Sequence, residues 1–148
     1  MRKLAILFCL ALLAPSALAS GPSDPDQTDA GAKVPHIVLA GLEAYRAKGN
    51  AEDAVKVWTV GSPLDGSKMA LSETNNLNQV EGFYGTYRTF DVLKVLDLSP
   101  KVRVVYLTLD YEKGPLFGRF VVYRTDQGWI LTSFNFNTDE EKILPCVP

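Results

Sequence analysis

Histidine and cysteine are scarce in this 148-residue sequence, which contains one histidine and two cysteines. A single histidine cannot supply the ligands of a usual zinc site, so we expect no metal. The sequence also lacks a Gly-x-Ser-x-Gly elbow, a His-Glu-x-x-His motif, a glycine-rich phosphate loop and EF-hand spacing. It therefore predicts no catalytic residue and no cofactor.

Positive charge is also in short supply. Lys and Arg number 15 against 17 Asp and Glu, which gives a formal net charge of −2. Nucleic-acid-binding domains carry clustered Lys and Arg, so this balance argues against a nucleic-acid partner. The composition, 47% hydrophobic and 22% charged, is that of an ordinary globular protein and excludes a coiled coil or a disordered chain.

No apolar run reaches the length of about 20 residues that spans a bilayer. Residues 4–13 form an apolar run of ten, which follows Arg2 and Lys3 and precedes a small-x-small triplet ending at Ala19. This order is typical of a cleaved signal peptide. We therefore expect residues 1–19 to be removed after Ala19, leaving a periplasmic or secreted protein with no membrane span.

The mature chain begins with a segment, residues 20–33, rich in Ser, Gly, Pro and Asp and without large apolar side chains. This composition predicts a flexible linker, so the folded α+β domain is expected over residues 34–148. Only Cys146 remains after cleavage, which excludes an internal disulfide.

Helical signals fill the first half of this domain. Pro35 suits a first helical position and Gly49 a left-handed end, while Asn50 and Asp53 have the spacing of a helix cap. A third, weaker helix is expected over residues 67–83. Two consecutive asparagines interrupt it, so it could be two short pieces.

The second half changes to strand patterns rich in Val, Phe, Tyr and Thr. Short turns separate four such segments, so we expect an antiparallel meander and an α+β fold with two or three N-terminal helices packed on the sheet. The predicted strands are residues 86–98, 101–112, 115–125 and 129–138.

Alternation along these strands predicts which residues face the helices. With Tyr111 opposite Leu116 and a three-residue loop before Trp129, one face becomes almost wholly apolar. The expected core-face residues are Val105, Leu107, Leu109, Tyr111, Leu116, Phe120, Val122, Ile130, Phe134 and Phe136.

The same register gives the outer face more apolar and aromatic residues than a solvated face carries, so we expect a contact surface there. A homodimer is the simplest form of it. In the alternative, the third helix or the C-terminal tail covers this face within one chain. The expected interface residues are Tyr106, Phe117, Arg119, Tyr123, Trp129 and Leu131.

Helices followed by a curved four-stranded meander over residues 34–140 resemble the nuclear-transport-factor-two-like, or cystatin-like, superfamily. The resemblance rests on the order of elements. It implies a pocket between the sheet and the first helices, and dimers formed through the sheet; some members are isomerases, dehydratases or epoxide hydrolases. This chain lacks the strand pair between the second and third helices that some of these enzymes have, so no catalytic residue is carried over.

Three functions are compatible with these features. The favoured one is an exported non-catalytic domain that binds a small ligand or an envelope protein, with Tyr45, Trp58 and Tyr111 lining the ligand pocket. The alternatives are a pocket enzyme of isomerase or hydrolase type, and a structural accessory domain of an envelope complex. A buried carboxyl group beside that pocket would favour the enzyme, because desolvation raises the pKa as a catalytic base requires.

Overall fold

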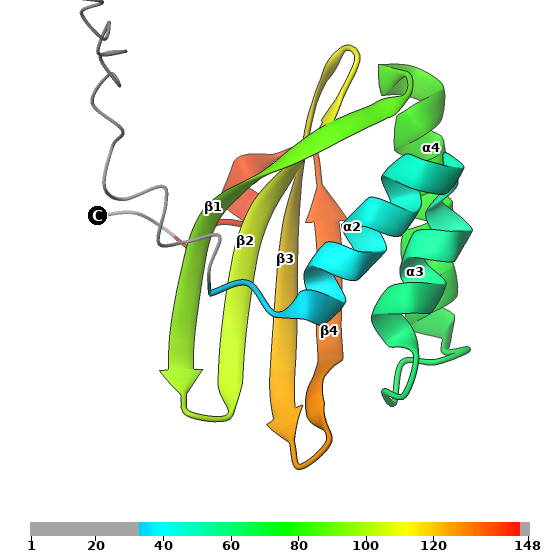
Figure 1. The fold of residues 1–148 in the computed structure, drawn as a ribbon. Helices are drawn as coiled ribbons and strands as arrows, with labels where there is room; N and C mark the ends of the chain where they lie inside the picture. Colours follow the sequence, from blue (N-terminus) through cyan, green and yellow to red (C-terminus); the bar gives the residue numbers. More distant parts are fainter. Residues whose placement is uncertain (1–32, 146–148) are drawn as a thin grey trace, which may run out of the picture.

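The computed structural model describes residues 33–145, so the predicted signal peptide, its cleavage site at Ala19, nearly all of the predicted linker and Cys146 lie outside the described residues. Within this described part of the chain, three helices are followed by four strands and a short 3-10 helix (Figure 1). The elements are α2 (His36–Lys48), α3 (Ala51–Thr59), α4 (Lys68–Tyr84), β1 (Tyr87–Ser99), β2 (Val102–Tyr111), β3 (Gly114–Thr125), β4 (Gly128–Asn137) and η1 (Glu140–Lys142).

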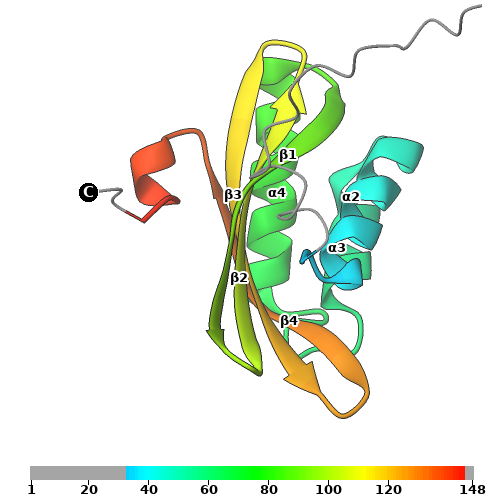
Figure 2. The same ribbon diagram turned by 60° about the vertical axis from the view of Figure 1, so that its left-hand side comes forward.

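The four strands form one antiparallel sheet in the order β1-β2-β3-β4. The three helices lie against one face of this sheet and η1 lies on the other (Figure 2). This arrangement confirms the predicted α+β fold with N-terminal helices packed on a meander. No helix among residues 33–145 is long and apolar enough to cross a membrane.

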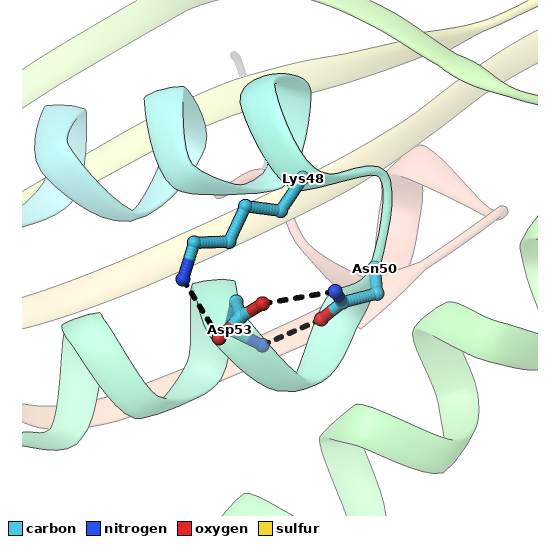
Figure 3. A network of polar contacts seen from close by, with 3 residues as sticks. All are labelled: Lys48, Asn50 and Asp53. Atoms are coloured by element: carbon cyan, nitrogen blue, oxygen red, sulfur yellow. Dashed lines mark hydrogen bonds and ion pairs between the residues drawn. The ribbon is translucent and has the colours of Figure 1, made fainter.

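The helix ends follow the local signals in the sequence. Gly49 ends α2 in the left-handed conformation, with φ of 67°. The Asn50 side chain then accepts a hydrogen bond from the Asp53 backbone N–H at 2.8 Å and donates one to the Asp53 carboxylate at 2.9 Å (Figure 3). Lys48 pairs with the same carboxylate at 3.2 Å. The hydrogen bond from Asn50, and then the one from Lys48, lower the pKa of Asp53.

Helix α4 runs without a break through both asparagines, so the division into two pieces does not occur. Leu77 and Val80 are buried on its inner side. The Asn76 side chain donates a hydrogen bond to the backbone carbonyl of Phe136 at 3.3 Å. The asparagine that weakens the helix locally therefore binds it to edge strand β4.

A tryptophan from α3 occupies the centre of the core. The Trp58 ring lies 5.0 Å from Phe120, 6.0 Å from Phe134 and 5.9 Å from Phe136, centroid to centroid. Its indole N–H donates a hydrogen bond to the Val38 carbonyl of α2 at 2.9 Å. Helix α3 is thus joined to α2 on one side and to strands β3 and β4 on the other.

The expected core face is confirmed in strands β2 and β3, where every predicted residue is buried. In β4 the pairing slips. Val121 pairs with Ser133 but the next residue, Val122, pairs with Leu131, so Thr132 is an extra residue on β4. The Thr132 hydroxyl donates a hydrogen bond to the Val121 carbonyl at 3.1 Å. This bond stabilises the bulge where the regular ladder is interrupted.

The bulge inverts the alternation toward the start of β4, so three predicted positions are wrong. Leu131 is fully buried in the main core instead of lying on the outer face. Trp129 also packs against the main core, with the Arg103 guanidinium 5.1 Å from its ring centroid. Ile130, expected in the core, pairs with Tyr123 and is only half-buried.

Candidate functional site

The three predicted pocket residues lie in the core rather than around an open pocket. Tyr45 and Trp58 are completely buried, and Tyr111 is 6% exposed. The structure brings Tyr45 and Tyr111 together, with their hydroxyl oxygens 3.1 Å apart. Trp58 packs instead in the separate phenylalanine cluster described above. The three side chains predicted to line a ligand pocket are therefore packed inside the domain, and the prediction that they bind a ligand stays a prediction.

A third tyrosine completes the cluster around Tyr45. The Tyr87 ring stacks on Tyr45 with centroids 4.6 Å apart and meets Tyr111 edge-on at 5.8 Å. The Tyr45 hydroxyl also lies 3.5 Å from the carboxylate of Glu81, to which it donates. Three rings and their hydroxyls thus fill the space between α2, β1 and β2.

The phenols of this cluster are protonated at neutral pH, as ordinary tyrosines are, and burial raises their pKa further. It raises the pKa of Tyr45 to about 12, against the lowering effect of the hydrogen bond with Tyr111. Burial raises the pKa of Tyr87 and of Tyr111 as well. Within residues 33–145 no buried side-chain polar atom lacks a hydrogen-bond partner. The interior is therefore a closed and satisfied core, and the cluster supplies donors rather than a base.

Open space begins at the edge of the tyrosine cluster, in a crevice between α2 and β1. It has a volume of about 150 Å³. Tyr87 belongs to both the cluster and the crevice. The lining residues are Leu42, Glu43 and Arg46 from α2, and Tyr87, Thr89 and Phe90 from β1.

Polar atoms supply most of the exposed lining of the crevice, and two of its lining residues are charged. Leu42 is almost fully buried and Phe90 is half-buried, whereas Glu43 and Arg46 are exposed. Neither charged group forms an ion pair within the part of the chain that the structure describes. The charged ends of these two side chains are therefore free to meet solvent or a ligand in the crevice.

Sequence analysis missed the crevice because strand alternation does not predict it. Tyr87 and Phe90 are three residues apart, yet both pack against the helices. The β1–β2 pairing slips between Tyr87 and Thr89, which brings both aromatic residues to the same side. Glu43 and Arg46 have the spacing that places two residues on one helix face, but that spacing alone is common on solvated helices.

The predicted outer contact face is partly covered by the chain itself. Ile143, only 4% exposed, packs with Val104 and Tyr106, and Leu144 and Phe117 lie against the same small cluster. This arrangement agrees with the second expectation from the sequence, in which the C-terminal segment covers the outer face within one chain (Figure 2). The apolar centre that motivated a homodimer is therefore occupied within one chain.

The remaining expected interface residues are divided between the two faces. Arg119 is half-buried on the outer face, and Tyr123 there is 38% exposed. Trp129 and Leu131 lie on the inner face, as described above. The six residues therefore do not form one surface.

Two properties of the acidic groups among residues 33–145 bear on metal binding and on acid–base chemistry. No group of three His, Cys, Asp or Glu residues that could hold a metal occurs among the described residues. Burial raises the pKa of the Glu73 carboxyl, against smaller lowering effects of Asn76 and the Phe136 backbone. Glu73 therefore belongs to the contact between α4 and β4, and it does not face the crevice.

Comparisons with known proteins give no family for this chain. No protein-family model, no curated protein and no solved structure matches it.

Proposed function

We propose that this chain is an exported, non-catalytic domain that binds a small polar ligand in the crevice between α2 and β1. One observation carries the proposal. The interior expected to hold a ligand is filled by Tyr45, Trp58 and Tyr111, whereas the crevice at its edge has free volume and two charged groups without described partners. The crevice lies between the first helix and the first strand, beside the place where the resemblance to nuclear-transport-factor-two-like proteins implies a pocket.

A nitrogen-15 NMR titration of the exported form with mixtures of small polar metabolites tests this proposal. We expect resonances of residues 42–46 and 87–90 to shift with at least one mixture, because these segments line the crevice. Residues around Ile143 serve as an internal control on the opposite face of the sheet. Shifts confined to that opposite face, or no shifts with any mixture, would contradict the proposal.

The pocket-enzyme alternative has a separate readout. An enzyme of this type requires a desolvated carboxyl group that faces open space. Among the described residues, burial raises the pKa of the Glu73 carboxyl, but this group contacts Asn76 and the Phe136 backbone and does not line the crevice. Conversion of a bound metabolite during the titration, seen as new ligand resonances, would favour the enzyme over the binding domain.

A further inference from the structure

We infer that the crevice selects small zwitterions, with Arg46 binding a carboxylate and Glu43 binding an ammonium group. The ligand class is that of the smallest α-amino acids. This inference rests on the function proposed above and adds the chemical class of the ligand.

The volume of the crevice limits the ligand to a few atoms. Drug-sized ligands occupy pockets of about 300–1,000 Å³. The crevice has about 150 Å³, and a cavity of about that volume holds a single benzene ring. A ligand of about six non-hydrogen atoms, the size of alanine, therefore fits.

The two charges favour a ligand that carries both signs. Glu43 and Arg46 are three residues apart on α2, and no ion pair within 4 Å joins them or links either to another described residue. A simple carboxylate would meet Arg46 but be repelled by Glu43, and a simple amine would meet the opposite difficulty. A zwitterion satisfies both side chains at once. Charge-assisted hydrogen bonds to each end give the strongest polar contacts available at such a site.

The wall of the crevice supplies a neutral donor beside Arg46. The Tyr87 hydroxyl makes no hydrogen bond to any described side chain or backbone group. Burial raises its pKa and the nearby charge of Arg46 lowers it, with burial the larger effect, so the phenol stays protonated. A carboxylate held by Arg46 can therefore accept a second hydrogen bond from Tyr87.

The apolar part of the crevice sets an upper limit on side-chain size. Phe90, which is half-buried, offers the crevice an apolar surface, whereas Leu42 is only 1% exposed, and the tyrosine cluster behind them limits the depth of the space. A methyl group on the α-carbon can pack there, but a branched four-carbon side chain exceeds the space. Affinity is therefore expected to fall from alanine to leucine.

The test titrates the exported form with glycine, alanine, leucine, acetate and methylamine and follows the amide resonances of residues 42–46 and 87–90. Glycine and alanine should shift these resonances at lower concentration than acetate or methylamine, and leucine should bind more weakly than alanine. Arg46→Gln and Glu43→Gln should each weaken alanine binding about tenfold or more, the loss expected for one charge-assisted hydrogen bond.

Matched controls separate lost binding from lost structure. Lys56→Gln and Glu52→Gln remove the same charges from exposed positions on α3, outside the crevice, and should leave alanine affinity unchanged. Arg46 lies in the last turn of α2, where a positive charge also stabilises the helix end. The unfolding midpoint of every variant is therefore measured beside its affinity, and an affinity loss counts only where the fold persists.

Each contrary result identifies which proposal fails. If acetate binds as well as alanine and Glu43→Gln has no effect, the zwitterion inference is overturned while the crevice remains a binding site. If alanine, acetate, methylamine and the metabolite mixtures all leave the crevice resonances unmoved, both the inference and the proposed function fail.

Discussion

Replacing Gly41 by alanine is expected to destabilise the fold, although alanine is the better helix former. Gly41 lies within α2 directly beneath the indole of Trp58. A Cβ added there would lie 2.5 Å from Cε2 of Trp58 and closer still to Nε1 and Cδ1. The fully buried indole has no free space to retreat into, because Phe120 and Phe134 enclose its other side.

Three effects set the magnitude. Overfilling a packed core costs about 1–3 kcal/mol. Displacing the indole also endangers its 2.9 Å hydrogen bond to the Val38 carbonyl, and leaving a buried donor unpaired costs about 1–3 kcal/mol. The intrinsic helix preference for alanine returns only about 0.5–1 kcal/mol. We therefore expect Gly41→Ala to lower the free energy of unfolding by about 2–4 kcal/mol.

Gly82→Ala is the matched control. Gly82 also lies inside a helix, α4, but a Cβ there would meet nothing within 4 Å. It should stabilise the protein by about 0.5–1 kcal/mol, so the two identical substitutions have opposite signs. Urea unfolding followed by circular dichroism gives both values from linear extrapolation.

A double-mutant cycle localises the effect. Gly41→Ala combined with Trp58→Phe should cost less than the sum of the single changes, since phenylalanine lacks the indole N–H edge that the new methyl group would strike. If Gly41→Ala were as stable as the wild type, or if its cost were additive with Trp58→Phe, the close approach of α2 and α3 at this point would be refuted.

Three further outcomes are expected. If the chain is exported as proposed, mass spectrometry of the mature protein should find an N-terminus at Ser20, and a retained leader would contradict the proposed compartment. Asn50→Ala should cost about 1 kcal/mol at neutral pH. Because the pKa of Asp53 is lowered in the fold, its stabilising contribution is present above its unfolded pKa and is lost as pH falls through the folded one. The stability difference between Asn50→Ala and the wild type in urea unfolding should therefore shrink in acid, below the ordinary range of an aspartate. Ile143→Ser should lower the free energy of unfolding by about 1.5–3 kcal/mol and expose the outer sheet face, so that light scattering detects self-association. An unchanged monomer of equal stability would show that the tail does not cover the sheet.

The helix ends could be predicted from the sequence because their causes are local. The left-handed Gly49 and the capping Asn50 act within one turn of their own position, and both signals are legible in a few consecutive residues. The continuity of α4 is different. Asn76 gains its partner from Phe136 in the last strand, a contact that no window of the sequence contains.

The side of the sheet that each β4 residue occupies could not be predicted from the alternation of apolar and polar residues. Trp129 and Leu131 occupy one set of alternate positions and Ile130 the other, so both faces read as apolar and the pattern does not fix the register. The deciding feature is the bulge at Thr132, which side-chain hydrogen bonding to the backbone stabilises.

The candidate site was predicted only in part. The sequence analysis grouped Tyr45, Trp58 and Tyr111, and the structure brings Tyr45 and Tyr111 into contact while Trp58 packs among phenylalanines elsewhere in the core. The sequence could not show that a third ring, Tyr87, would close the space between the two tyrosines, because that position depends on a slip in the β1–β2 pairing. The crevice lies at the edge of the space that these aromatic rings fill, and Tyr87 belongs to both.

The position of Trp58 also determines the order in which the chain can fold. During synthesis α2 and α3 emerge first, yet the surfaces that bury Trp58 are completed by Phe134 and Phe136 near the end of the described chain. Helices of this length are marginal by themselves in water. The apolar faces of α2 and α3 therefore stay exposed until β4 pairs with the sheet. Contacts between such distant segments slow folding, and apolar surface that is exposed in the meantime favours aggregation.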